Sequence, residues 1–170
     1  LNAGKKMLTL GGDHYISLPL LRAHAREHGP LALIHFDAHT DTYPDEEGPS
    51  PGSNAPEFNP ATTFSRAAEE GVIDPAGSLH IGARGSISSQ GVFEYTRNKG
   101  FELITGIELT QKGVEGILTH IHDRLRGRPV YLCWDMDFFD PSCAPGVFTP
   151  TWGGASAGEG LRLLQGLAGL

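Results

Sequence analysis

The chain has 170 residues, of which 39% are hydrophobic and 19% charged, a composition typical of one soluble domain with a hydrophobic core. Its net charge of −7 argues against a surface that binds nucleic acid or an anionic membrane. No apolar stretch approaches the roughly 20 residues of a membrane-spanning helix. Two cysteines, Cys133 and Cys143, are too few for a disulfide framework, so we expect a cytoplasmic protein. Because the sequence does not begin with Met, we expect it to be part of a longer chain.

Short apolar runs alternate with helical patterns along the sequence. In chain order we expect a strand at 6–11, a helix at 18–27, a strand at 31–36, a helix at 62–70, strands at 78–83 and 101–105, a helix at 114–125, a strand at 129–135 and a helix that begins near Ser156. The strand runs are apolar throughout, as expected of strands that are covered on both faces. This rhythm predicts an α/β domain in which helices cover both sides of one parallel sheet.

One region breaks this rhythm. Residues 44–60 contain five prolines and have no helical or strand pattern, so they predict a long surface loop, and such loops are often functional. We find no internal repeat and no linker, and we therefore expect a single domain over residues 1–170.

Acidic and imidazole side chains follow directly after the strand predicted at 31–36. Asp37, His39 and Asp41 stand at alternate positions there. Side chains at i and i+2 of an extended segment share a side, so these three groups project together from the strand end. Open parallel sheets bind ligands at the carboxyl ends of their strands, which makes this edge the predicted binding site.

Two other strand ends carry the same kind of side chain. Asp135 and Asp137 follow the strand predicted at 129–135, and His14 follows the strand predicted at 6–11. Four aspartates and two histidines are thus expected at one edge of the sheet. Like charges this close repel one another, so either some carboxylates take up protons or cations neutralise them.

The composition of this predicted cluster favours two divalent ions. Four carboxylates match two such ions in charge, and a carboxylate-rich donor set favours Mn²⁺, although zinc and iron are not excluded by ligand type. Paired ions share a bridging water whose pKa they lower, so that hydroxide is available at neutral pH. The chemistry predicted from these residues is hydrolysis.

Three motifs together resemble the metal-binding motifs of the ureohydrolases, the arginase and agmatinase family, and stand in the same order: "GGDH" at 11–14, "DAHTD" at 37–41 and "DMDFFDP" at 135–141. The stretches "LNAGKKMLTLGGDHYISLPLLRAHA" and "HFDAHTDTY" look closest to bacterial agmatinases. The resemblance implies a three-layer α/β/α sandwich with a mainly parallel sheet, here incomplete at both ends. It also implies that residues 1–170 are part of a ureohydrolase domain and that the protein forms a trimer or hexamer.

The same resemblance implies an activity and a set of ligands. The activity would be hydrolysis of a guanidino compound, foremost agmatine to putrescine and urea, a step of polyamine biosynthesis, by a hydroxide that bridges two Mn²⁺ ions. Asp37 and Asp135 would be the carboxylates that bridge the ions and hold the hydroxide. The remaining ligands would be His14 and Asp41 for one ion, and His39 and Asp137 for the other.

Two departures from the family pattern leave alternatives open. Agmatinase-like proteins carry a histidine in a segment resembling "EFxHGTxF", whereas this chain has "EFNPATTF", with Pro60 at the position of the histidine. The family's carboxylate for the substrate guanidinium would lie beyond Leu170. The substrate could therefore be guanidinobutyrate, guanidinopropionate, arginine or formimidoylglutamate, and the protein could instead be a metal-binding but catalytically impaired homologue.

Several other polar residues allow two interpretations. His35, two residues before Asp37, either orients that ligand or packs within its strand, and His80 is expected to be structural. Asp13 either bonds to His14 or holds its turn. Asp140 is expected to cap a turn, and Cys133 to act as a small buried hydrophobe. The glycine-rich "GARGS" at 82–86 lacks the spacing of a phosphate-binding loop, and we predict no ligand there.

Overall fold

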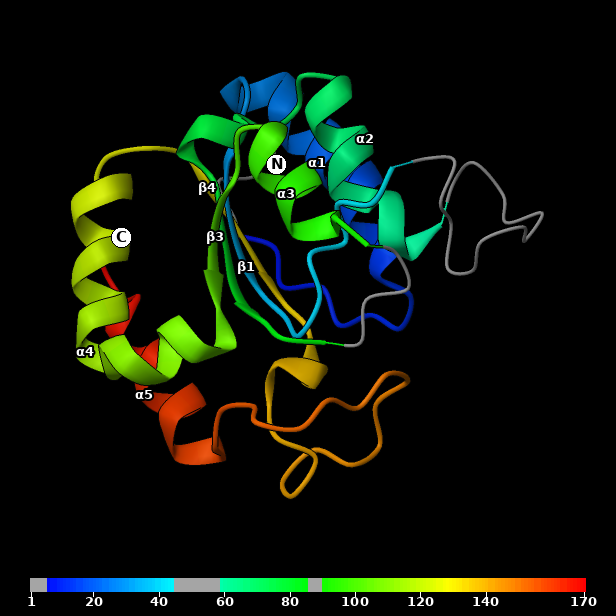
Figure 1. Ribbon diagram of the computed structural model, residues 1–170. Helices are drawn as coiled ribbons and strands as arrows, with labels where there is room; N and C mark the ends of the chain where they lie inside the picture. Colours follow the sequence, from blue (N-terminus) through cyan, green and yellow to red (C-terminus); the bar gives the residue numbers. More distant parts are fainter. Residues whose placement is uncertain (1–5, 45–58, 86–89) are drawn as a thin grey trace.

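A computed structural model of the chain describes residues 6–44, 59–85 and 90–170. Within them, four strands form one parallel sheet in the order β3-β2-β1-β4 (Figure 1). The strands are β1 (Ala32–Phe36), β2 (Leu79–Ala83), β3 (Glu102–Thr105) and β4 (Val130–Trp134). The predicted α/β class is therefore confirmed, and so are four of the five predicted strands.

Helices cover both faces of this sheet (Figure 1). One layer contains α1 (Ser17–His28), α2 (Thr63–Glu69) and α3 (Val92–Asn98), and the other contains α4 (Gly106–Leu125) and α5 (Ala157–Gly166). Short 3-10 turns join these elements: η1 (His14–Ile16), η3 (Pro60–Thr62), η4 (Pro75–Gly77) and η5 (Met136–Phe138). The arrangement is the expected three-layer α/β/α sandwich.

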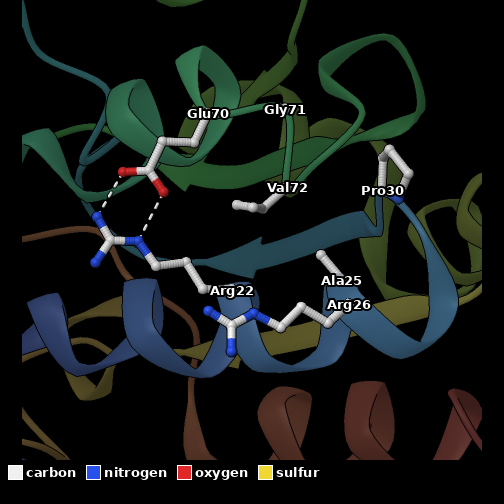
Figure 2. A pocket seen from close by; sticks show the side chains of 7 residues that line it. All are labelled: Arg22, Ala25, Arg26, Pro30, Glu70, Gly71 and Val72. Carbon is white, nitrogen blue, oxygen red and sulfur yellow. Dashed lines mark hydrogen bonds and ion pairs between the residues drawn. The ribbon is translucent and has the colours of Figure 1, made fainter.

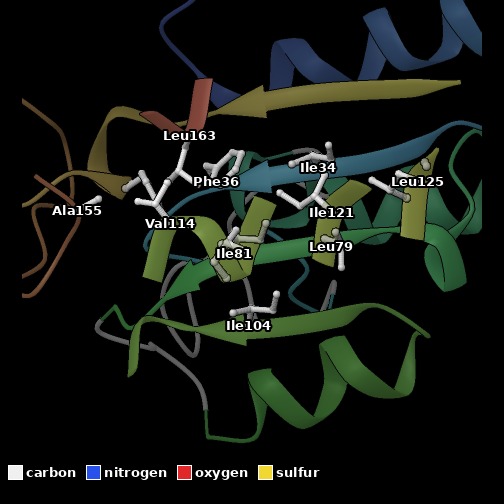
Figure 3. Packing of buried hydrophobic residues seen from close by; sticks show 13 residues of the cluster. Ile34, Phe36, Leu79, Ile81, Ile104, Val114, Ile121, Leu125, Ala155 and Leu163 are labelled. Atoms are coloured by element: carbon white, nitrogen blue, oxygen red, sulfur yellow. The ribbon is translucent and has the colours of Figure 1, made fainter. Parts of the chain in front are cut away.

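Alternation along β1 assigns its side chains to two separate cores. Ala32, Ile34 and Phe36 point toward α4 and α5, where they join buried residues of β2 and β3 (Figure 3). Leu31 and Leu33 face the other layer and pack with Phe64 and the α1 leucines. Because successive strand residues alternate between faces, His35 and then Asp37 follow Leu33 on the α1 and α2 side.

Two helical features were not predicted from the sequence. Helix α3 was missed altogether, and α4 begins at Gly106, eight residues before the predicted start at 114. Thr105 and Glu108 form a capping box that starts α4, but Gly113 has φ 64° and ψ 174° and interrupts the helical geometry. This interruption breaks the apolar periodicity, which explains why only the second part of the helix was recognised.

The strand predicted at 6–11 is wrong in the described part of the chain. Residues 6–10 have no regular secondary structure, and Leu8 and Leu10 are 86% and 88% exposed. A strand needs a neighbour for its backbone N–H and C=O groups, and among the described residues this segment has none in the sheet. An apolar run alone therefore did not specify a strand.

Most of the predicted loop at 44–60 lies outside the described residues; Pro44, Asn59 and Pro60 are described. No helix among the described residues has the length and apolar character needed to cross a bilayer.

Gly82 in β2 packs closely against the backbone of Asp37 at the end of the neighbouring strand β1. It has φ 106°, and a Cβ atom added there would lie 2.7 Å from the Phe138 ring and 2.9 Å from the backbone oxygen of Asp37. Only glycine accommodates both the backbone conformation and this close approach. The backbone of Asp37 can therefore lie this close to β2 because residue 82 has no side chain.

We predict that Gly82→Ala is more destabilising than Gly29→Ala. Both glycines have positive φ, but a Cβ on Gly29 meets nothing within 4 Å. The conformational cost of roughly 1–2 kcal/mol is common to both variants, and overpacking should add about 1–3 kcal/mol at Gly82 only. Free energies of unfolding of the two variants and the wild type measure the difference. Equal losses would contradict the proposed steric constraint beside Asp37.

Candidate metal centre

All six residues predicted as metal ligands converge at the carboxyl end of the sheet. Asp37 follows β1 and Asp135 follows β4, and the register Phe36↔Trp134 sets these two strand ends side by side. The backbone N–H of Asp135 donates to the Phe36 carbonyl at 2.9 Å, which extends the pairing to the site itself. His14 begins η1 and reaches the same edge. The others are His39, Asp41 and Asp137.

His14 gathers three carboxylates on one side of the cluster. Its Nδ1 lies 2.8 Å from Asp41 Oδ2 and 3.3 Å from an oxygen of each of Asp37 and Asp135. Asp41 lies beyond the end of β1 and has φ 43°, a left-handed backbone conformation that is uncommon for a residue other than glycine.

His39 gathers the carboxylates on the other side. Its Nδ1 lies 3.0 Å from Asp137 Oδ2 and 3.4 Å from Asp37 Oδ1. Asp137 is fixed by two further donors, the Ala38 N–H to Oδ1 at 2.9 Å and the Thr149 hydroxyl to Oδ2 at 3.1 Å. The loop after β4 thus supports this second group, and Thr149 is a contact that the sequence reading missed.

Asp37 belongs to both groups. Its Oδ2 faces His14, whereas its Oδ1 faces His39 and accepts the His39 backbone N–H at 2.6 Å. The side chain is 2% exposed. A carboxylate with one oxygen directed to each of two imidazoles has the arrangement needed to bridge two cations.

The electrostatics of the cluster favour positive charge. Burial alone would raise the pKa of Asp37, but His35, His14 and His39 outweigh it and hold that pKa well below its usual range. Burial opposes a charged His39, yet Asp137 and Asp37 raise the pKa of His39 to about 10. The pKa of Asp137 rises to about 6, mainly through burial and despite its bond to His39. Positive charge is therefore stabilised between these carboxylates.

The donor atoms fit a pair of divalent cations. Among the described residues there are three sets of candidate ligand atoms, and the atoms of each set lie within 4.8 Å of one another. One set is His14, His35 and Cys133; the two sets that include carboxylates are His14, His35, Asp37 and Asp41, and Asp37, His39 and Asp137. Both of these two sets contain Asp37, and both are dominated by oxygen and imidazole nitrogen, which suit hard or borderline ions. Asp135 is in none of the three sets, although it contacts His14; its side chain is 31% exposed.

The other polar residues singled out from the sequence are also placed. Asp13 accepts the Tyr15 N–H at 2.8 Å, so it holds the turn at η1. Asp140 accepts the N–H groups of Ser142 and Gly153, which confirms a turn cap. Cys133 is more than a small hydrophobe, because its Sγ lies 2.9 Å from His14 Nε2. Its position two residues before Asp135 places both on one side of the strand, a signal present in the sequence.

Arg84 is a further residue that the sequence reading missed. Within the described part of the chain, its guanidinium donates to backbone carbonyls along the segment that carries Asp137 and Thr149 and on β2. The acceptors are the carbonyl oxygens of Gly82, Asp137, Phe139, Thr151 and Trp152, at 2.8–3.3 Å. Burial lowers the pKa of Arg84. Arg84 thus fastens the loop after β4 to the end of β2.

A hollow of about 450 Å³ (Figure 2) is lined by residues that are not part of this cluster. Pro30 and Val72 line it near the start of β1, so it is at the opposite end of the strand from Asp37. Arg22 donates both hydrogen bonds of a paired contact to Glu70 across it. We assign it no part in the chemistry.

The chain belongs to the arginase family. A profile of that family matches residues 1–170. The agmatinase of Citrobacter koseri is 41% identical over all 170 residues, which cover 50% of its length. The structure of a hypothetical agmatinase from Burkholderia thailandensis aligns with 98% of this chain and 48% of its own, with 39% identity and a TM-score of 0.81. Proclavaminate amidino hydrolase from Streptomyces clavuligerus aligns with 92% of this chain and 50% of its own, with 38% identity and a TM-score of 0.83.

These likenesses confirm the suspected family and the arginase-like fold. They also show that the chain spans about half the length of the curated relatives it matches. The described sheet is therefore one part of the family fold, and β3 and β4 are the outer strands of that part.

We predict that Arg84→Met loosens the loop after β4. Methionine keeps an unbranched stem but removes every donor, and a hydrogen bond involving a charged group contributes about 1.5–3 kcal/mol. Amide hydrogen exchange across residues 138–155 of the full-length protein should therefore become at least roughly tenfold faster. Arg162→Met, at an exposed position of α5, is the matched control. Unchanged exchange in Arg84→Met would refute the fastening role.

Proposed function

We propose that the full-length protein is a metal-dependent ureohydrolase that hydrolyses a guanidino compound, foremost agmatine to putrescine and urea, with two Mn²⁺ ions. The observation that carries this proposal is the orientation of the Asp37 carboxylate. One of its oxygens faces His14 and the other faces His39, and each of these imidazoles also contacts other carboxylates. The family supports the reaction class, and the likeness to agmatinases supports the choice of substrate.

The proposed ligands follow the two halves of the cluster. Asp37 and Asp135 would contact both ions. The ligands of one ion only would be His14 and Asp41 for the first, and His39 and Asp137 for the second. When bound, such a pair of ions lowers the pKa of a shared water and makes hydroxide available at neutral pH. The carboxylate-rich donor set favours Mn²⁺ over ions that prefer thiolates.

The chain's own residues orient this site. Ala38 N–H and the Thr149 hydroxyl fix the two oxygens of Asp137, and Arg84 holds the backbone on either side of it. Ligands whose own hydrogen bonds are satisfied keep their orientation when substrate enters, because little reorganisation is left to pay for. These contacts therefore support a site whose shape is set by the fold before a substrate arrives.

The proton-transfer step is where this chain departs from the family pattern. Pro60 begins η3, which packs against η1, the turn that carries His14. Position 60 thus belongs to a turn that packs beside the cluster, yet it has neither an imidazole nor a backbone N–H. This observation favours a second candidate, a homologue that binds metal but turns over agmatine slowly or prefers another guanidino compound.

We further propose a cytoplasmic homo-oligomer, a trimer or hexamer. The two cysteines are free, which suits a reducing compartment. The oligomeric state rests on the family resemblance alone, and sedimentation of the full-length protein would determine it.

We predict two manganese ions per chain of full-length protein purified with Mn²⁺. Asp135→Ala should lose both ions, because the proposed bridging carboxylate serves each of them. Asp123→Ala, which removes an exposed carboxylate on α4, is the matched control and should keep both. Elemental analysis measures the metal content. Retention of both ions by Asp135→Ala would show that the assignment of bridging ligands is wrong.

We also predict that Pro60→His accelerates urea release from agmatine at least several-fold. A positioned acid–base group typically contributes about 10²–10⁴-fold to a rate, and the wild-type loop lacks one at this position. Pro60→Ala separates loss of the proline from gain of the imidazole and should not accelerate the reaction. The measurement is a urea assay of manganese-loaded protein with agmatine and the other guanidino compounds. A fast wild type that Pro60→His leaves unchanged would show that this position has no part in proton transfer.

A further inference from the structure

Two fully buried histidines stand behind Asp37. His35 of β1 and His80 of β2 are partners in the parallel register, and both side chains are 0% exposed. Their Nδ1 atoms lie 2.7 Å apart. His35 Nε2 lies 2.9 Å from Asp37 Oδ2, on the side of the carboxylate that also faces His14.

The contacts continue beyond the histidine pair. His80 Nε2 lies 3.1 Å from the Thr42 hydroxyl, which donates to the Thr40 carbonyl at 2.9 Å. A chain of polar contacts within hydrogen-bond distance therefore runs from the Asp37 carboxylate through two imidazoles to the Thr42 hydroxyl.

The chemistry of Asp37 fixes the essential feature of this chain. An ionised carboxylate only accepts hydrogen bonds, so His35 Nε2 must carry the proton that it shares with Asp37. One proton must also lie between the two Nδ1 atoms, whichever imidazole holds it. His80 therefore keeps the second nitrogen of His35 engaged, and this keeps the first one turned toward Asp37.

The surroundings leave the two imidazoles few other partners. The Phe64 ring lies 4.5 Å from the His35 ring, and the Phe101 ring lies 4.7 Å from the His80 ring, between centroids. In such an apolar setting an unpaired imidazole nitrogen is costly, because it loses its hydrogen bond to water and gains no other partner. The buried pair is stable because each nitrogen has a partner.

His35 could be read as a metal ligand, because its ligand atom lies near those of His14, Asp37 and Asp41. Its contacts argue for a different role. Both of its nitrogens are engaged, one by Asp37 and one by His80. His14 also has a partner at each nitrogen, but its Nδ1 faces three carboxylates. His35 instead contacts Asp37 and another imidazole, and it therefore acts on the site through Asp37.

We propose that His35 and His80 are positioning residues that fix the orientation of the Asp37 carboxylate, so that its two oxygens serve two different cations. This inference rests on the proposed function, because it takes Asp37 to be the shared metal ligand. It adds residues beyond the six proposed ligands and assigns the β1–β2 pair a part in metal affinity. The burial of His80 agrees with it, since the contact that joins His80 to Asp37 runs through His35.

The test compares His80→Asn with His80→Leu in the full-length protein. The asparagine amide places a group near the position of Nδ1 that can donate to or accept from His35, whereas leucine can do neither. A packing role predicts that leucine, the larger and apolar residue, is tolerated at least as well as asparagine. A positioning role predicts the opposite order in the affinity for Mn²⁺.

Free Mn²⁺ is measured by electron paramagnetic resonance during titration, together with the thermal unfolding midpoint of each variant. We expect His80→Leu to weaken Mn²⁺ binding by about 10–100-fold and His80→Asn to stay close to the wild type. His35→Gln and His35→Leu form a second pair, because the glutamine amide can replace the Nε2 donor. In this pair too, the glutamine variant should bind Mn²⁺ more tightly than the leucine variant. The pair replaces the first test if His80→Leu does not fold.

The outcomes distinguish this inference from the proposed function. If the wild type binds two Mn²⁺ ions but the amide and leucine variants lose affinity equally, or neither loses any, the positioning role is overturned and the proposed function stands. If the wild type binds no Mn²⁺, the proposed function fails and the positioning role with it.

Discussion

The buried carboxylate of Asp37 is the constraint on which the site depends. A carboxylate that is 2% exposed needs positive charge or several hydrogen-bond donors around it. The fold supplies them from three directions: His14 from η1, His39 from the turn after β1, and His35 from within β1. Three more aspartates then crowd around the same histidines. Bound cations would lower the repulsion between these carboxylates, and this is the physical ground for the proposed metal centre.

The order of the strands makes this convergence possible. With β1 between β2 and β4, the end of β1 has a neighbour on each side. Asp135 and Asp137 follow β4 and contact the two histidines of the site. On the other side of β1, His80 of β2 contacts His35, and Arg84, which follows β2, donates to the backbone of Asp137. Alternation along β1 separates the two tasks of the strand. One face fills the core against α4 and α5, and the other leads from Leu33 through His35 to Asp37.

The sequence predicted the parts of the fold that depend on local pattern and on chemistry at strand ends. Continuous apolar runs predicted the four paired strands, and alternate acids and imidazoles after them predicted which side chains would meet. The segment at 6–11 shows the limit of this reasoning, because pairing depends on a neighbour elsewhere in the chain. Helix α4 shows another limit, since Gly113 breaks the periodicity that reveals a helix.

The supporting contacts were harder to predict than the ligands. His80 lies in β2 and Arg84 directly follows β2, in a stretch whose sequence has no obvious chemical motif. Their roles depend on the β1–β2 register and on the path of the loop after β4. Such roles become visible only when distances are known. Cys133 was predictable only in part. Its spacing from Asp135 indicated that both side chains lie on one side of β4, but its contact with His14 depends on the position of η1.

The central claim, that Asp37 is shared by two metal ions, is tested most directly by anomalous diffraction at the manganese edge from crystals of the full-length protein grown with Mn²⁺. The account predicts two peaks, one beside His14 and Asp41 and one beside His39 and Asp137, with Asp37 contacting both. A single peak, or two peaks of which only one contacts Asp37, would contradict it.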